Sequence, residues 1–344
     1  MQKTVQIVSL SSGILGEPFV AHELDLGIRR LGEYGLTVRF SEHALRGIDY
    51  IKAHPEARAA DLLAAFADPT VDIVLCAIGG DDGYRLAPCL FDDNKLKNAV
   101  CQKVFLGFSD TTWHHFMLHK LGLPTFYGQA FLPDVCELDR EMLPYTRHYF
   151  EELIETGAIR EITPSPVTYD ERTSFGEDQV GVPRVSHANE PFAHLQGAPV
   201  FSGKILGGCL DTIYDMFDGT RYPDAPEIAC RYGLFPSADE WRGKILLLET
   251  SEEKMPPEKY ARAVAYLKDA GVFGEVSGVL LGKPMDGTYD GEYRRILLDT
   301  VADPTLPILA NLSVGHATPR CIIPFGVDAT VDATRQCIAF SPEK

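Results

Sequence analysis

The alternation of short, continuous apolar runs with amphipathic segments in the first third of the chain most constrains the fold. TVQIVSL (4–10) predicts a strand, and VDIVLCAI (71–78) is apolar on both faces. Helical periodicity is clear in HELDLGIRRLGEYG (22–35) and EARAADLLAAFAD (56–68). Apolar strands separated by helices are typical of a parallel sheet that is covered on both sides. The sequence therefore predicts an α/β fold.

The chain is expected to form two domains, because 344 residues are many for a single hydrophobic core. Its composition changes near residues 160–200, which are rich in Pro, Ser, Thr and charged residues and show little hydrophobic periodicity. A stretch of that length without clear elements is a linker or a functional loop. We expect an N-terminal α/β domain over 1–165, a polar linker and substrate loop over 166–199, and a C-terminal domain over 200–344.

The net charge of the chain indicates which kinds of molecule it is expected to bind. The formal net charge is −17. Such a surface repels polyphosphates and anionic lipids, so neither a nucleic acid nor a membrane surface is expected as a partner. A small anionic substrate remains compatible, because local basic residues outweigh a distant net charge within a screened pocket.

The pattern of cysteines and the length of the apolar runs indicate the cellular compartment. Eight cysteines are scattered without a CxxC pair, and several lie inside apolar runs, which favours a reduced cytosolic protein over a disulfide framework. The first residues lack the apolar core of a signal peptide, and no apolar run reaches the roughly 18–20 residues of a membrane span. A cytoplasmic location is expected.

A serine lies where a buried strand turns sharply into a helix, in VFLGFSDTTWHHFML (104–118). Such a turn lifts Ser109 above the carboxyl edge of a parallel sheet, where ligands bind. The amide groups of the helix N-terminus then lie beside it, in place to stabilise an oxyanion. An alternative from spacing alone is that Ser109 or Asp110 only caps the helix.

A second glycine-rich turn follows another buried strand, at Gly79-Gly80-Asp81-Asp82-Gly83. A dinucleotide loop is disfavoured, because the spacing is not GxGxxG and two aspartates repel a pyrophosphate. Two interpretations stay open at this point: an ordinary turn into the next helix, and a second oxyanion donor from the Gly80 N–H group.

Ser109 needs a base, and ten histidines compete for that role. His316 lies in the loop SVGHATPR beside a strand, which is a common setting for a catalytic histidine and an equally ordinary one for a structural histidine. Glu249 ends the apolar run KILLLE and could orient a histidine or cap the next element. His115 and His119 have the i, i+4 spacing of metal ligands, but no HExxH glutamate accompanies them, so no metal is expected.

Taken together, the segments resemble the peptidase S66 family, which includes the LD-carboxypeptidases and the microcin C7 self-immunity proteins. The resemblance runs in collinear order over nearly the whole chain. Its blocks are IGG (78–80), GFSDTT (107–112), FYGQ (126–129), GGCLDTI (207–213), LLLETSEE (246–253), GVLLGK (278–283) and GHATPR (315–320).

The resemblance implies a role for each candidate residue. It makes Ser109 the nucleophile, His316 the general base and Glu249 the carboxylate that orients the histidine. It also implies an oxyanion hole formed by the backbone N–H groups of Gly80 and Asp110. The implied fold is a flavodoxin-like parallel-sheet domain followed by a smaller β-rich domain, with the active site between them. The implied assembly is a homodimer without a cofactor or metal.

Two departures from the family pattern bear on the substrate. Murein-recycling members typically have R-G-G-Y-G at the first glycine turn, whereas this chain has Ile78-Gly79-Gly80-Asp81, which favours the microcin-immunity branch. Members of both branches often carry Asn or His after the second glycine pair, where this chain has Cys209.

The polar loop near 163–195 resembles the family's substrate-specificity loop but contains no tryptophan. An aromatic partner for an adenine would therefore have to come from another residue, with Tyr169, Phe175 and Phe192 as candidates.

The expected function is that of a serine carboxypeptidase or amidohydrolase. It would cleave an amide bond near the C-terminal end of a peptide, or in an aminoacyl-nucleotide, by acyl transfer to water. The alternatives are a murein tetrapeptide LD-carboxypeptidase that releases terminal D-Ala and, from another class, a non-catalytic binding module. The expected partners are accordingly a small peptide, a muropeptide or a peptidyl-nucleotide.

Overall fold

The first sheet of the computed structural model, which describes residues 2–341, has six strands in the order β14-β5-β4-β3-β1-β2. Strands β1 to β5 run parallel, and β14 lies antiparallel to β5 at the edge. The order 2-1-3-4-5 is that of flavodoxin-like sheets, as predicted. The bounds are β1 (Thr4–Val8), β2 (Thr37–Phe40), β3 (Ile73–Cys76), β4 (Val104–Gly107), β5 (Thr125–Tyr127) and β14 (Ile323–Phe325).

Helices cover this sheet because its central strands are apolar on both faces. All four residues of β3 are buried. Helix α3 begins with a proline in its first turn, where the missing N–H group would have no partner within the helix. The helices of this half are α1 (Ala21–Glu33), α2 (Ile48–Ala53), α3 (Pro55–Ala67), α4 (Ala87–Phe91), α5 (Lys95–Ala99), α6 (Thr112–His119) and α7 (Pro144–Thr156).

The second sheet has eight strands in the order β6-β16-β15-β10-β11-β12-β13-β9. Its four strands β10 to β13 run parallel, and antiparallel strands extend it on both sides. The strands are β6 (Glu161–Ile162), β9 (Ala193–Gln196), β10 (Val200–Cys209), β11 (Ile245–Glu249), β12 (Gly278–Gly282), β13 (Ile308–Leu312), β15 (Asp328–Asp332) and β16 (Cys337–Phe340). The accompanying helices are α8 (Leu210–Asp215), α9 (Ala225–Tyr232), α10 (Ala238–Trp241), α11 (Pro257–Asp269), α12 (Val272–Glu275) and α13 (Asp290–Val301).

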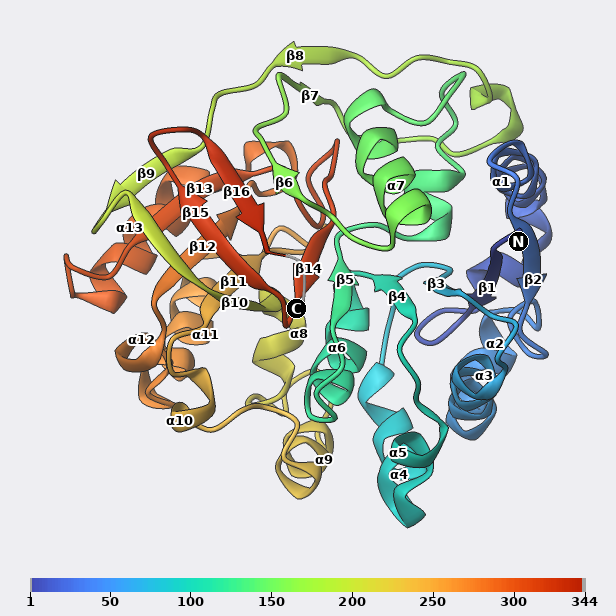
Figure 1. Ribbon diagram of the computed structural model, residues 1–344, viewed down its shortest axis with the longest axis horizontal. Coiled ribbons are helices and arrows are strands. Elements are labelled where there is room, and N and C mark those ends of the chain that lie inside the picture. Colours follow the sequence, from blue (N-terminus) through green and yellow to red (C-terminus); the bar gives the residue numbers. More distant parts are fainter. Residues whose placement is uncertain (1, 342–344) are drawn as a thin grey trace.

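The two sheets lie next to one another, with the first half of the chain on one side of Figure 1 and the orange and red C-terminal elements on the other. Strand β14 crosses from the C-terminal region into the first sheet, so the halves are joined by main-chain pairing. The end of β10 contacts the start of α6, where the Cys209 N–H group donates to Thr112 Oγ1 at 3.1 Å. Because of this junction, the carboxyl ends of β4, β11 and β13 come together.

The polar segment after α7 contains more regular structure than its composition suggested. Strands β7 (Val167–Tyr169) and β8 (Ser186–Ala188) pair as a separate antiparallel ribbon, which Figure 1 shows arching over one end of the molecule. Tyr169 also donates its backbone N–H group to the Thr318 carbonyl at 3.0 Å, beside the loop of His316.

None of the helices within residues 2–341 combines the length and the apolar character that are needed to cross a bilayer.

Candidate active site

Ser109 occupies a strained turn between β4 and α6. Its φ is +65°, in the left-handed region that costs a non-glycine residue about 1–3 kcal/mol. Its backbone N–H group donates to the Tyr127 hydroxyl at 3.2 Å, which helps to hold this conformation. This backbone conformation places the hydroxyl past the carboxyl end of β4, as in the nucleophile turns of other hydrolases.

Helix capping, the alternative interpretation of this turn, is wrong for both residues. Neither side chain makes a capping hydrogen bond at the start of the 3₁₀ turn Ser109–Thr111 or of α6. Instead, Asp110 Oδ2 accepts the Gly83 N–H group at 2.9 Å and joins the two glycine-rich turns. Burial raises the pKa of Asp110 to about 6.

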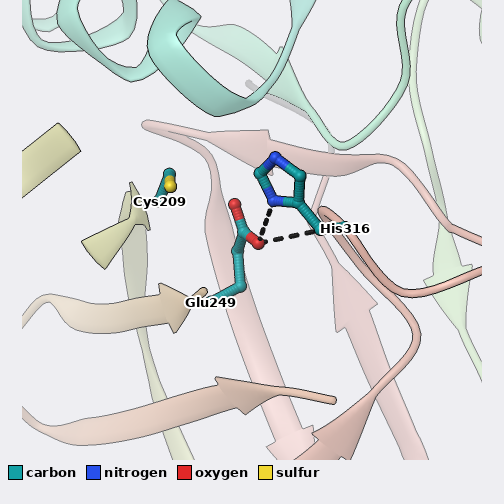
Figure 2. A group of neighbouring side chains, drawn as sticks. All are labelled: Cys209, Glu249 and His316. Carbon is teal, nitrogen blue, oxygen red and sulfur yellow. Dashed lines mark hydrogen bonds and ion pairs between the residues drawn. The ribbon is translucent and has the colours of Figure 1, made fainter. Parts of the chain in front are cut away.

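His316 and Glu249 complete a hydrogen-bonded chain with Ser109. His316 Nε2 lies 3.0 Å from Ser109 Oγ, and Nδ1 lies 2.7 Å from Glu249 Oε2. The His316 backbone N–H group donates to the same carboxylate oxygen at 3.2 Å (Figure 2). Both side chains are buried. The structure thus brings together the three residues that were selected from the sequence, from the ends of three different strands.

A glycine makes the approach of the His316 loop to Glu249 feasible. Gly315 has a φ of +69°, and a Cβ atom at this position would lie 2.2 Å from Glu249 Cδ. Any side chain there would therefore separate the histidine from its carboxylate.

Tyr127 is a member of this network that the sequence did not single out. Its hydroxyl donates to Glu249 Oε1 at 2.5 Å and accepts the Ser109 N–H group. Tyr127 lay in the FYGQ block of the resemblance, but nothing in the sequence indicated its partner. With both oxygens of Glu249 engaged, the carboxylate has one defined orientation.

Replacing Tyr127 with phenylalanine is expected to lower kcat about 10- to 100-fold. A hydrogen bond to a charged group contributes about 1.5–3 kcal/mol, and its loss frees Glu249 to rotate away from His316. Steady-state kinetics measure the effect, with Tyr145→Phe as a control, because the Tyr145 hydroxyl donates to the Thr163 carbonyl and not to Glu249. Equal losses in both variants would contradict a specific role for Tyr127.

The first glycine turn lies directly against Ser109. A Cβ atom at Gly79 would come within 2.5 Å of Ser109 Cβ and 3.4 Å of the Asp110 backbone nitrogen. Only glycine leaves room for this contact. The backbone segments that hold Gly80 and Asp110, the predicted oxyanion donors, therefore meet beside the hydroxyl of Ser109.

A cavity of about 570 Å³ opens over Ser109 and His316. This volume is in the range of small-molecule sites. A larger cavity of about 940 Å³ is lined by Lys3, Val104 and Phe126, at the other ends of the strands of the first sheet, and holds none of the candidate residues. The larger of these two cavities is therefore not the one that contains the candidate residues. We assign the candidate site to the smaller cavity, because Ser109 and His316 line it.

Of the three aromatic residues proposed from the sequence as partners for an adenine, one lines the cavity. Phe175 lines the cavity and is 55% exposed, whereas Phe192 is only 4% exposed in the core, so its candidacy was wrong. Tyr169 lies in β7 and is not among the lining residues. Phe19 lines the same cavity and is 61% exposed. Its place there could not be predicted from the sequence, because Phe19 lies far from the polar loop in the chain.

Buried ion pairs fasten the polar loop over this cavity. Glu137 lies 2.9 Å from Arg172 and 2.7 Å from Arg184, and all three side chains are almost wholly buried. Burial raises the pKa of Glu137, but the two guanidinium groups outweigh it and hold the pKa below its usual value. The loop therefore has a defined position relative to the first half of the chain.

Within residues 2–341, one group of three side chains has donors close enough together to hold a metal. Cys209, Glu249 and His316 offer ligand atoms within 4.8 Å of each other (Figure 2). Glu249 and His316 already share a hydrogen bond, however, and burial raises the pKa of the Cys209 thiol well above its usual value, which disfavours the thiolate. His115 contacts Thr125 Oγ1 at 2.7 Å and the Gly107 carbonyl at 3.1 Å, so both of its ring nitrogens are occupied as well.

Exhaustive dialysis against EDTA is expected to leave activity within about twofold of the untreated protein, because no proposed role needs a metal. The assay is hydrolysis before and after chelation. Loss of activity that Zn²⁺ restores would contradict this expectation and would direct attention to Cys209 and to the His115–His119 pair.

Comparison with known proteins identifies the family. Residues 5–128 match the LD-carboxypeptidase N-terminal domain, and residues 202–331 match the LD-carboxypeptidase C-terminal domain. This chain belongs to the LD-carboxypeptidase family, peptidase S66. The prediction of a carboxypeptidase of the hydrolase class is thereby confirmed.

Curated members of the LD-carboxypeptidase family resemble the chain over most of their length. A Vibrio cholerae protein whose name describes a carboxypeptidase is 30% identical over 284 residues, which are 80% of this chain and 76% of the relative. A Bacillus subtilis protein whose name describes a murein peptide carboxypeptidase is 25% identical over 91% of this chain and 85% of the relative.

Solved structures of LD-carboxypeptidase relatives include a much closer match. An MccF-like protein from Streptococcus pneumoniae, solved in complex with AMP, is 58% identical and has a TM-score of 0.98, with full coverage of both chains. The microcin C7 self-immunity protein MccF, in its wild-type apo state, is 22% identical with a TM-score of 0.79 over 99% of this chain and 96% of its own, which shows a shared fold.

Proposed function

We propose that Ser109 is the nucleophile of an acyl-transfer reaction, with His316 as general base and Glu249 as the carboxylate that orients it. The observation that carries this proposal is the continuous chain of hydrogen bonds from Ser109 Oγ through His316 to Glu249, next to a cavity. His316 Nε2 accepts the serine proton as Oγ attacks the scissile carbonyl. The leaving nitrogen then takes that proton, and water hydrolyses the acyl-enzyme.

The backbone N–H groups of Gly80 and Asp110 are proposed to hold the oxyanion of the tetrahedral intermediate. They belong to the two turns that meet beside Ser109. Preorganised donors of this kind are effective because they need no reorientation as charge develops, and removal of one typically costs about 3–4 kcal/mol.

The proposed substrate is an aminoacyl- or peptidyl-nucleotide, cleaved at the amide-like bond between the acyl group and the nucleotide part. Two exposed aromatic rings, Phe19 and Phe175, line the cavity and could stack on a nucleobase. The 58% identical pneumococcal relative was solved with AMP. The first glycine turn, Ile78-Gly79-Gly80-Asp81, also favours this branch of the family.

A mass-spectrometric hydrolysis panel tests this choice. It contains an aminoacyl sulfamoyl adenosine and a murein tetrapeptide, because one relative is named for murein peptides. Release of the free amino acid from the nucleoside compound supports the proposal. Release of D-Ala from the tetrapeptide alone would replace it with the LD-carboxypeptidase alternative.

Three expectations from the sequence stay predictions: a cytoplasmic location, a homodimer, and the division into 1–165, 166–199 and 200–344. Analytical ultracentrifugation of the purified protein distinguishes a dimer from a monomer.

A further inference from the structure

Glu252 holds a position that the mechanism above does not use. Its Oε2 lies 3.0 Å from His316 Nε2, the same nitrogen that faces Ser109 Oγ. The side chain lines the cavity together with these two residues and is 59% exposed. A carboxylate that a ligand can reach is therefore in contact with the reacting atoms.

The turn that carries Glu252 is fixed by polar contacts on both sides. Before it, the Ser251 N–H group donates to Asp211 Oδ2 at 3.0 Å. After it, Lys254 pairs with Asp286 at 2.7 Å. Glu252 is thus presented to the cavity from an anchored backbone, although its side chain remains accessible.

Two carboxylates contact His316, Glu249 at Nδ1 and Glu252 at Nε2. Burial lowers the pKa of His316, but Glu249 and Glu252 outweigh burial and raise it to about 10. The contact with His316 in turn lowers the pKa of Glu252 to about 2, with a further contribution from Arg221. An imidazolium has no lone pair, so it cannot accept the proton of Ser109. A proton that Nε2 donates to Glu252 therefore competes with the acceptance of the Ser109 proton at the same nitrogen.

We propose that Glu252 binds the free α-ammonium group of an aminoacyl substrate, and that this binding releases His316 to act as a base. The inference rests on the aminoacyl-nucleotide function proposed above and adds a requirement for an unblocked amine. The ammonium neutralises Glu252, the imidazolium loses one of its two stabilising charges, and its Nε2 proton passes to water in the cavity. His316 Nε2 then faces Ser109 with a free lone pair.

The dimensions of an aminoacyl group agree with this assignment. The α-nitrogen lies about 2.5 Å from the carbonyl carbon. A productive complex places that carbon about 3–3.5 Å from the nucleophile. Ser109 Oγ and Glu252 Oε2 are each 3.0 Å from the same nitrogen of His316, so an ammonium next to the scissile carbonyl can be oriented to form an ion pair with Glu252. An acylated α-nitrogen, as in the interior of a peptide, carries no charge and would leave Glu252 paired with His316.

The test compares an aminoacyl sulfamoyl adenosine with its N-acetylated form in wild type, Glu252→Gln and Glu253→Gln. In wild type, kcat/KM is expected to be at least about 10-fold higher for the free amine. Glu252→Gln should lower the value for the free amine about 10- to 100-fold and leave the acetylated compound within about twofold of wild type or faster. Glu253 is exposed and adjacent, so Glu253→Gln should change neither value.

The possible failures are distinguishable. Equal losses on both compounds in Glu252→Gln, or no preference for the free amine in wild type, would overturn the ammonium subsite while the nucleotide function stands. Turnover of a murein tetrapeptide and of neither nucleoside compound would overturn both proposals.

A substrate-independent measurement tests the resting ion pair. The imidazole nitrogen shifts of His316 are followed by NMR as the pH is raised. Its midpoint should lie lower in Glu252→Gln than in wild type, because one of the two neighbouring carboxylates, Glu249, remains and the other is neutralised. An unchanged midpoint would overturn the proposed coupling between Glu252 and His316.

Discussion

Replacing Ser109 with alanine is expected to lower kcat by roughly 10⁴-fold or more, because the reaction loses its covalent route. Residual activity would come from binding and from the oxyanion donors alone. The fold should persist, since alanine has the same Cβ atom and leaves the Ser109 N–H contact with Tyr127 intact. Steady-state kinetics with the aminoacyl sulfamoyl adenosine measure the loss, and thermal unfolding checks the fold.

Ser202→Ala is the matched control for this substitution. Ser202 lies on β10 and its hydroxyl contacts only Thr330 Oγ1 at 3.0 Å, far from the cavity. Its activity should equal that of wild type. A fully active Ser109→Ala variant would contradict the proposed mechanism outright.

Glu249→Gln is expected to lower kcat by about 10³- to 10⁴-fold, as loss of the orienting carboxylate does in other serine hydrolases. Glu249 accepts three hydrogen bonds, from Tyr127 and from the side chain and backbone of His316. A glutamine presents an NH₂ group to one of these donors and carries no charge to stabilise the imidazolium. The pKa of His316 should therefore fall, and the alkaline limb of His316 titration should move to lower pH.

The exposed Glu258 on α11 provides the control, as Glu258→Gln removes the same charge at a distance. If Glu249→Gln retained wild-type kcat, His316 and Ser109 would act as a dyad and Glu249 would have only a structural role.

The sequence predicted the elements that place the site because each rests on local pattern. The apolar runs that became β3 and β11 are buried throughout, and continuous burial is what such runs indicate. The strand–turn–helix around Ser109 was similarly visible, since a buried strand, a glycine and a helical pattern follow one another directly. The roles of His316 and Glu249 came from the resemblance, because loop histidines and strand-end acids are ordinary features in isolation.

Contacts between distant segments could not be predicted from local sequence pattern. Tyr127 and Glu249 are 122 residues apart, and no local pattern indicates that a strand-end hydroxyl will meet a particular carboxylate. Phe192 was mistaken for a cavity residue, because composition does not reveal whether an aromatic side chain in a polar segment turns into the core. Glu252 was visible in the LLLETSEE block, yet its contact with His316 depends on how β11 and β13 are brought together.

The most direct test of the central claim is a crystal structure of Ser109→Ala bound to an uncleaved aminoacyl sulfamoyl adenosine. The account predicts the scissile carbonyl carbon about 3–3.5 Å from the place of the missing Oγ. The carbonyl oxygen should lie about 2.7–3.2 Å from the backbone nitrogens of Gly80 and Asp110. A substrate whose carbonyl faces away from residue 109, with another side chain poised to attack it, would contradict the account.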